Sequence, residues 1–314
     1  MGERPSPAGG SASRGAAGRA VSWLYDQPPL LLTLTTLFWG GNIVAGQLAP
    51  GEVAPMQLVL ARWVLVALAL SILFRADIRD AWPAVRARLP IVIFMAAVGF
   101  TSFNGLFYLS SLHTTGVNQG ILQGAIPVFV LMMSRAAYGT RVGPVQMVGV
   151  ALTMAGVAVI ATGADPVRLI ESGLNPGDAL MLVACACYAF YATALQRRPA
   201  VPGRAFFALM SVVAAITSLP GALAEAALTA PPTPTATGWL IILYVAAFPS
   251  CLAQLFFLRG VDLIGPGRAG VYVNLVPVFG ALLSIGLLGQ VAAPYHAVSL
   301  LLVLSGIWLA QRGR

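Results

Sequence analysis

The sequence predicts an all-α polytopic membrane protein whose ten transmembrane helices form two inverted five-helix repeats. Hydrophobic residues make up 58% of the 314 positions and charged residues only 9%. A soluble domain of this size cannot bury so much apolar surface, so lipid must be the solvent for most of it. Ten apolar runs approach the ~20 residues that a helix needs to cross a bilayer. The second half of the chain also repeats the first.

The predicted spans are separated by short connections. In order, they cover residues 30–49, 55–74, 90–112, 115–134, 144–163, 177–196, 205–224, 238–258, 266–288 and 293–311. The first repeat is therefore expected at 30–163 and the second at 177–311, after a disordered cytoplasmic tail over 1–29. The charged and apolar residues that alternate between Arg75 and Leu89 favour a segment on the membrane surface.

Nine of 33 positions are identical when residues 126–158 are moved forward by 150. Matched prolines and glycines carry most of this signal, because they determine helix kinks and close backbone contacts. They are Pro127/Pro277, Gly139/Gly289, Pro144/Pro294 and Gly156/Gly306. Internal repeats in a polytopic membrane chain are typical of transporters, in which substrate binds where the two halves meet.

Arginine distribution predicts the orientation. All 18 basic residues are arginine, and 16 of them fall in the tail, in alternate loops and at the carboxyl terminus. Positive residues favour the cytoplasmic side, so both termini are expected inside. Five spans per repeat is an odd number, so the second repeat enters from the opposite side and is inverted. Two nearly equivalent conformations, and alternating access, follow from that symmetry.

Polar and aromatic side chains at membrane depth are the candidate substrate-binding residues, because they are costly there unless paired or lining a wet cavity. Tyr188 and Tyr191 correspond to Trp39 and Asn42 at an offset of 149. The full candidate set is Trp39, Asn42, Asn104, Tyr108, Gln119, Gln123, Tyr188, Tyr191, Gln254, Tyr272 and Asn274, with Pro127 and Pro277 as kinks or hinges. Uncharged donors, acceptors and aromatic faces suit a small amphipathic or zwitterionic solute.

Structural interpretations compete with this one. Asn and Gln often hydrogen-bond neighbouring membrane helices, and Tyr or Trp near helix ends often belong to the interfacial belt. Gly116, Gly120 and Gly124 form a small-residue ridge that favours close helix packing. For the prolines, fixed kinks are favoured over hinges.

Arg62 is the one charged residue expected inside a span. It is either an anion partner in the cavity or a residue near the outer interface, and the interface is favoured, with Glu52 as a plausible ion-pair partner. His113 and His296 fall at the outer ends of helices, where a structural role is favoured over coupling to protons.

No acidic residue lies in the middle of a predicted span; Asp178 and Glu225 lie at span ends. Proton antiport through a buried carboxylate therefore lacks its titrating group, and facilitated export is the simpler mechanism. Cys185, Cys187 and Cys251 are expected to be core residues, and no metal or cofactor is expected. No hydrolase or nucleotide-binding motif indicates an enzyme, and the scattered arginines do not indicate nucleic-acid binding.

With these motifs in register, the chain resembles the EamA-type carriers of the drug/metabolite transporter superfamily, among them the YddG-like amino-acid exporters. The resemblance covers about residues 30–310. It is carried by Trp39-Gly40-Gly41-Asn42, by Arg62, by the Pro127/Pro277 pair, and by Gly139 with Pro144 and Gly289 with Pro294. Two departures leave the substrate open: Thr140 and Gln290 stand where the family often has a carboxylate, and Tyr188 stands where Trp39 would repeat.

The resemblance implies a bacterial inner-membrane exporter of small metabolites, most plausibly aromatic or neutral amino acids. The alternative is an exporter of cationic drugs such as methyl viologen, against which the missing buried carboxylate argues. The expected partners are a small-molecule substrate and the lipid bilayer, with a monomer favoured slightly over a dimer.

Overall fold

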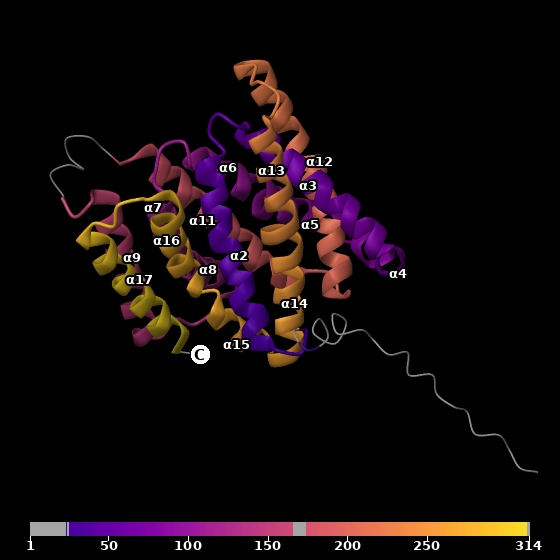
Figure 1. Cartoon of the computed structure of the whole chain (residues 1–314). Coiled ribbons are helices and arrows are strands. Elements are labelled where there is room, and N and C mark those ends of the chain that lie inside the picture. Colours follow the sequence, from indigo (N-terminus) through magenta and orange to yellow (C-terminus); the bar gives the residue numbers. More distant parts are fainter. Residues whose placement is uncertain (1–22, 24, 166–173, 313–314) are drawn as a thin grey trace, which may run out of the picture.

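The computed structural model describes residue 23 and residues 25–165 and 174–312 (Figure 1). Within these ranges ten helices are long and apolar enough to cross a membrane, which confirms the predicted fold class. Of the tail expected over residues 1–29, residues 1–22 and 24 lie outside the described residues, whereas residues 28–29 already belong to the first span. The first span begins at Pro28, two residues earlier than predicted.

Each repeat contributes five spans, several of them built from more than one helical segment. The first repeat comprises α2 (Pro28–Leu48), α3 (Pro55–Leu73), the short α4 (Arg75–Arg86), α5 (Leu89–Ala96), a π-helical segment (Ala97–Ser102), α6 (Phe103–Ser110), α7 (Gly116–Leu122), a 3₁₀ turn (Gln123–Ala125), α8 (Ile126–Tyr138) and α9 (Pro144–Thr162). The second comprises α11 (Pro176–Ala194), a 3₁₀ turn (Leu195–Arg197), α12 (Gly203–Thr229), α13 (Ala236–Val245), a π-helical segment (Ala246–Leu252), α14 (Ala253–Ile264), α15 (Pro266–Tyr272), α16 (Leu275–Leu288) and α17 (Pro294–Arg312).

Proline and glycine mark the helix ends. Six of the ten spans begin at a proline, whose fixed φ suits the first helical turn and whose missing N–H is not needed there. Gly139 ends α8 at φ 65° and Gly289 ends α16 at φ 64°, a left-handed conformation that favours glycine. The two positions are repeat-related at an offset of 150, so the same turn is built twice.

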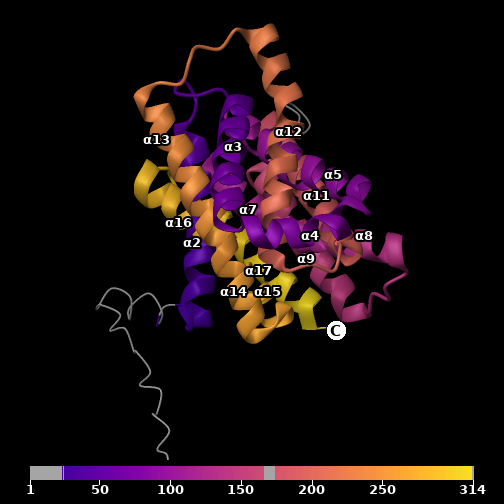
Figure 2. The same cartoon turned by 90° about the vertical axis from the view of Figure 1, so that its right-hand side faces the viewer.

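The packing of the helices follows a pseudo-twofold axis between the repeats. Helix α2 packs on α14 and α16 of the second repeat, and its counterpart α11 packs on α6 and α8 of the first. The remaining spans pair with their own counterparts, α3 with α12 and α9 with α17. Figure 1 shows α9 and α17 together at one edge of the bundle, and Figure 2 gives the same arrangement from the side.

Two spans contain π-helical segments that the sequence did not predict. Residues 97–102 and 246–251 correspond at an offset of 149, so the third and eighth spans are distorted at matched depths. The π-helix is rare and is frequently found at functional sites, because the wider turn changes the direction of side chains and frees backbone groups.

The fourth and ninth spans break at matched depths as well. The breaks are the 3₁₀ turn at Gln123–Ala125 and the gap between Tyr272 and Leu275. A proline ring clashes with the carbonyl group four residues earlier, and for Pro127 and Pro277 these carbonyls belong to Gln123 and Val273. Both breaks lie within the turn before these prolines, and the assignment of the prolines as fixed kinks rather than hinges stays a prediction.

Two connections differ in detail from the prediction. The Arg75–Leu89 segment forms helix α4, whose Ala81 and Val85 are buried in the bundle, and its predicted place on the membrane surface stays a prediction. Helix α14 continues to Ile264, beyond the span end predicted at residue 258, and carries Arg259 in its last turns.

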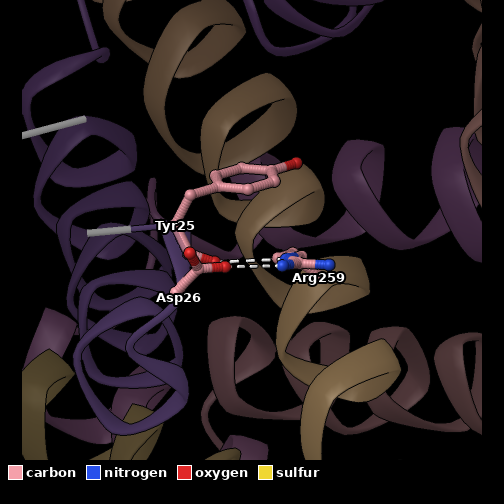
Figure 3. A network of polar contacts seen from close by, with 3 residues as sticks. All are labelled: Tyr25, Asp26 and Arg259. Carbon is pink, nitrogen blue, oxygen red and sulfur yellow. Dashed lines mark hydrogen bonds and ion pairs between the residues drawn. The ribbon is translucent and has the colours of Figure 1, made fainter. Parts of the chain in front are cut away.

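Arg259 anchors the segment that precedes α2. Its Nη2 lies 2.7 Å from Asp26 Oδ1, and its Nε donates a 3.1 Å hydrogen bond to the Tyr25 carbonyl oxygen (Figure 3). These contacts join the two repeats at the end of the bundle where the chain enters. Because the carboxylate is largely exposed, we expect a contribution of only about 0.2–1 kcal/mol from this ion pair.

Candidate transport cavity

A cavity lies between the repeats, and the space within it and at its mouth, open solvent included, amounts to about 990 Å³. Its lining comes from α2 and α3, from both π-helical segments and the helices α6 and α14 that follow them, from α11 and α12, from the broken fourth and ninth spans, and from α17. The distortions of these four spans are therefore concentrated at the cavity. They turn side chains toward it and interrupt helical backbone where it borders a hollow, the place where irregular backbone is tolerated in a membrane protein.

The structure brings most of the sequence-predicted site residues to this cavity. Those in its lining are Trp39, Asn42, Asn104, Gln123, Tyr188, Tyr191, Gln254 and Asn274, together with Pro127 and Pro277. Three predicted residues, Tyr108, Gln119 and Tyr272, are not in the lining.

Gln119 takes part in helix packing. Its side chain is fully buried, and its Nε2 donates to Ser110 Oγ at 2.5 Å and to the Phe107 carbonyl oxygen at 3.0 Å. Its Oε1 accepts a 2.9 Å hydrogen bond from Gln47 Nε2. The amide thus joins α7 to α6 and α2, the structural alternative that the sequence left open.

Tyr108 lies behind the cavity wall, and Tyr272 ends α15 away from the lining. The Tyr108 hydroxyl donates a 2.8 Å hydrogen bond to Asn42 Oδ1 and accepts one of 2.8 Å from Arg62 Nη1. Tyr108 therefore supports two lining residues without facing the cavity itself.

The interface interpretation favoured for Arg62 is wrong. Arg62 lies two turns into α3, about 10 Å along the axis from Pro55, and its side chain is only 6% exposed. Its Nε donates to Ser250 Oγ at 2.6 Å and its Nη1 to Asn104 Oδ1 at 2.5 Å, both of which line the cavity with it. Partners at this depth hold the guanidinium inside the bundle, so it need not reach the interface.

Glu52 does not pair with Arg62 either. Its carboxylate accepts a hydrogen bond from the Thr235 hydroxyl, in the connection before α13. The contact closes the loop between the first two spans onto the second repeat.

Arg62 is the only charged residue among the described residues that line the cavity. The remaining polar lining residues are amides and hydroxyl groups. A buried arginine stays protonated, so the cavity carries one fixed positive charge and no opposing carboxylate in its wall.

Aromatic rings form much of the remaining wall. Trp63 and Phe100 are stacked with centroids 4.7 Å apart, Phe100 meets Tyr191 at 5.3 Å, and Phe103 meets Tyr188 at 5.2 Å. The Trp39 indole donates a 3.1 Å hydrogen bond to the carbonyl oxygen of Pro249, inside the second π-helical segment. These contacts present flat apolar surface beside fixed polar groups, a combination that suits amphipathic ligands.

Sequence reasoning missed Trp63, Phe100, Phe103, Phe207, Pro249 and Ser250, all of which line the cavity. The aromatic residues lie in apolar runs, where nothing in the pattern separates a cavity wall from a lipid-facing surface. Pro249 and Ser250 carried a usable signal, because a proline followed by a hydroxyl group in the middle of a span indicates distorted backbone.

Polar contacts between the repeats close the bundle beyond the cavity, at the end where α2 finishes and α7 begins. Gln290, which follows α16, donates a 3.2 Å hydrogen bond to Gln47 Oε1 and accepts one of 3.2 Å from the Val117 amide. Nearer the cavity, α7 and α16 are in backbone contact: a Cβ atom on Gly120 would lie 3.2 Å from the amide nitrogen of Ala281. The glycine ridge is therefore a packing surface, as predicted.

Both histidines lie at this same end, where they line a second hollow. His296 Nδ1 accepts a 2.8 Å hydrogen bond from the Ala293 amide, and its Nε2 lies 3.3 Å from Asn118 Oδ1. The Asn118 side chain in turn bonds Asp178, which also accepts from the Thr114 hydroxyl. His296 thus caps the start of α17. No cluster of three or more potential metal ligands occurs within the described ranges.

Ten membrane-spanning helices in the described part of the chain, arranged as two inverted repeats with a cavity between them, define a transporter of the inverted-repeat class. The chain belongs to the EamA-like transporter family, whose model matches residues 28–162 and 175–311. It is a multi-pass membrane transporter.

Curated relatives cover nearly the whole chain. The uncharacterized transporter YyaM of Bacillus subtilis is 22% identical over 294 residues, covering 90% of this chain and 92% of its own. The uncharacterized inner membrane transporter YedA of Escherichia coli K12 is 24% identical, with coverage of 91% and 92%. A probable terminal-alkyne amino-acid exporter of Streptantibioticus cattleyicolor is 24% identical, with coverage of 90% and 92%.

A solved crystal structure has a similar fold. It superposes with a TM-score of 0.62 at 18% sequence identity, covering 90% of this chain and 96% of the other.

Proposed function

We propose that this transporter exports amino acids with aromatic or neutral side chains, by alternating access through the central cavity. The observation that carries the proposal is the lining: aromatic rings and uncharged amides surround a single guanidinium, with no carboxylate among the described lining residues. An aromatic or aliphatic side chain fits the rings, and the polar end of an amino acid fits the amides and the arginine. The relative whose printed name is a probable amino-acid exporter supports this substrate class.

The inverted repeats supply the conformational change. Because α2 and α11 make equivalent contacts in opposite repeats, exchanging the conformations of the repeats gives a second state of similar energy, with the opposite end open. In the state described here the end that carries Gln47 and Gln290 is closed. The matched breaks before Pro127 and Pro277 are the points at which the fourth and ninth spans bend during the exchange.

The proposed orientation in the membrane follows from the distribution of arginine along the chain. With both termini in the cytoplasm of a bacterial cell, the end closed by Gln47 and Gln290 faces outward, and we propose that the cavity opens to the cytoplasm in this state. The helix midpoints carry no carboxylate within the described residues, so we propose facilitated export down the substrate gradient, with no proton taken up at a buried acid.

Export of cationic drugs is the competing function. Aromatic faces hold cations, and this cavity has several. The Arg62 guanidinium opposes it, because a second positive charge brought into a poorly solvated cavity meets repulsion that no wall carboxylate offsets.

Counterflow in proteoliposomes tests the proposal. Purified protein is reconstituted into vesicles loaded with unlabelled phenylalanine, leucine or methyl viologen, and uptake of the labelled compound is followed. We expect accumulation of labelled phenylalanine and leucine and none of methyl viologen. Accumulation of methyl viologen alone would establish the drug-export alternative in its place. Empty vesicles and vesicles with the Gln123→Leu variant are the controls.

A further inference from the structure

The Arg62 guanidinium has one edge without a partner. Its Nε donates to Ser250, and its Nη1 donates both to Asn104 and to Tyr108. Nη2, which carries two more hydrogens, donates to no group among the described residues. Since the side chain is more than nine-tenths buried and lines the cavity, these hydrogens are available only to a molecule inside it.

The partners of Arg62 orient its charge without neutralising it. Each partner directs its own hydrogen elsewhere: Ser250 to the Val245 carbonyl, Asn104 to the Phe100 carbonyl at 2.6 Å, and Tyr108 to Asn42. All of them are neutral, and none of the ion pairs among the described residues includes Arg62. The Trp63 ring, whose centroid lies 5.0 Å from the guanidinium carbon, adds a cation–π contact but no negative charge. A buried charge is normally paired with an opposite one, and the described residues supply none to Arg62.

We propose that the Nη2 edge of Arg62 binds the carboxylate of the transported molecule, so that the carboxylate and not the ammonium group determines which compounds are carried. The inference rests on the proposed function and specifies its chemistry. A carboxylate would supply the missing anion and accept charge-assisted hydrogen bonds from the unused N–H groups. The ammonium group finds only neutral acceptors and ring faces in the described lining.

The Nη2 edge of Arg62, called the carboxylate anchor from here on, belongs to one repeat only. At the repeat offset of 149, Arg62 corresponds to Ser211, and Ser250 corresponds to Thr101. Thr101 donates to the Ala214 carbonyl and does not contact Arg62. The pseudo-symmetric cavity is therefore electrostatically one-sided, and the carboxylate is held against α3 and the second π-helical segment.

This proposal predicts which analogues of phenylalanine compete with it for transport. N-acetylphenylalanine and phenylpyruvate keep the carboxylate and lose the ammonium charge, whereas phenylalaninamide keeps the ammonium group and loses the carboxylate. We expect the first two to compete with labelled phenylalanine in counterflow within about threefold of phenylalanine itself, and the amide at least tenfold more weakly, the scale of one charge-assisted hydrogen bond. Competition by the amide equal to that of phenylalanine would overturn the proposal.

Variants separate an effect on carboxylate recognition from an effect on folding. Arg62→Gln should bring the amide-to-phenylalanine ratio of inhibitory concentrations close to one, and Arg62→Lys should keep a preference for carboxylates. Ser250→Ala, which removes a positioning contact, should lower that ratio, whereas the repeat-matched control Thr101→Ala should leave it unchanged. Because the ratio is measured within each protein, it does not depend on yield. Equal ratios in Ser250→Ala and Thr101→Ala would refute the positioning role of Ser250. A wild-type ratio in Arg62→Gln would refute carboxylate binding by Arg62. Should Arg62→Gln fail to fold, the ratio measured in Arg62→Lys decides instead.

A thermal-shift measurement distinguishes failure of this inference from failure of the proposed function. If wild-type protein gives no amino-acid counterflow but phenylpyruvate raises its melting temperature and phenylalaninamide does not, amino-acid export is wrong and the anchor stands. If phenylalanine counterflow is present and the amide competes fully, the proposed function stands and the anchor is wrong. Absence of stabilisation by every carboxylate tested, together with absence of counterflow, rejects both.

Discussion

Gly149 of α9 lies directly against Gly306 of α17. A Cβ atom on Gly149 would stand 2.5 Å from the Gly306 carbonyl oxygen, and a Cβ atom on Gly306 would stand 2.6 Å from the Gly149 carbonyl oxygen. The next contact along the pair joins Gly156 to Ser299, the repeat counterparts of Gly306 and Gly149. The fifth and tenth spans therefore meet across the pseudo-twofold axis through backbone atoms.

Valine at position 306 is expected to separate these two helices. The Thr153 hydroxyl is the nearest group, and behind it the Gly149 carbonyl oxygen and the Thr153 amide nitrogen both stand 2.6 Å from the added Cβ atom. These two backbone atoms cannot move aside as a side chain can, and overpacking of this kind costs about 1–3 kcal/mol. The melting temperature of the detergent-solubilised protein should fall by several degrees. Gly286→Val is the matched control, since a Cβ atom there meets nothing within 4 Å. An equal loss in both variants would mean that β-branching in a helix, and not helix contact, is responsible.

Gln119 and Gln123 are expected to respond in opposite ways to substitution by leucine. Gln119→Leu leaves the partner groups of a buried amide unsatisfied, at about 1–3 kcal/mol for each buried polar group, so the melting temperature should drop. Gln123 faces the cavity and makes one long hydrogen bond, of 3.5 Å, so Gln123→Leu should reduce phenylalanine counterflow severalfold at nearly unchanged stability. Each variant is the control for the other, and a shared phenotype would contradict the separation.

The two glutamines also mark where sequence reasoning ends. They lie four residues apart on one face of the predicted span, so periodicity assigns them the same role. What separates them is the 3₁₀ turn that begins at Gln123 and changes the direction of the helix. The kink itself was predictable from Pro127, because a proline ring clashes with the carbonyl group four residues earlier. Its effect on each side chain depends on neighbours that the sequence does not place.

Arg62 illustrates a second kind of limit. Apolar residues flank it on both sides, so its depth was ambiguous, and snorkelling was the simpler assumption. The groups that hold it are 42 and 188 residues away in the chain, on the third and eighth spans. By contrast, ten spans and two inverted repeats followed directly from apolar length, arginine distribution and matched Pro and Gly residues, because lipid imposes those constraints locally.

The contact between Gln47 and Gln290 is expected to break during each transport cycle, because it joins the two repeats at the closed end. Cysteines at both positions, with Cys185, Cys187 and Cys251 replaced by alanine, should be joined by a short reducible thiosulfonate cross-linker. Cross-linking should abolish counterflow, and reduction should restore it. The single Gln47→Cys variant, treated in the same way, controls for modification alone. Full counterflow in the cross-linked protein would show that this end stays closed throughout transport.

Reporter fusions test the orientation on which the direction of export depends. Sixteen of the 18 arginines, including those at positions 312 and 314, fall on the predicted cytoplasmic side. A fluorescent protein fused after residue 314 should therefore fold in the cytoplasm and be bright. Alkaline phosphatase fused there should be inactive, and the same enzyme inserted after Thr233, in the connection between α12 and α13, should be active. The opposite pattern would place the closed end inward and turn the described state into one open to the outside. Replacing Arg135 and Arg141 with glutamine should weaken the cytoplasmic signal of the first repeat without changing the cavity, since neither lines it.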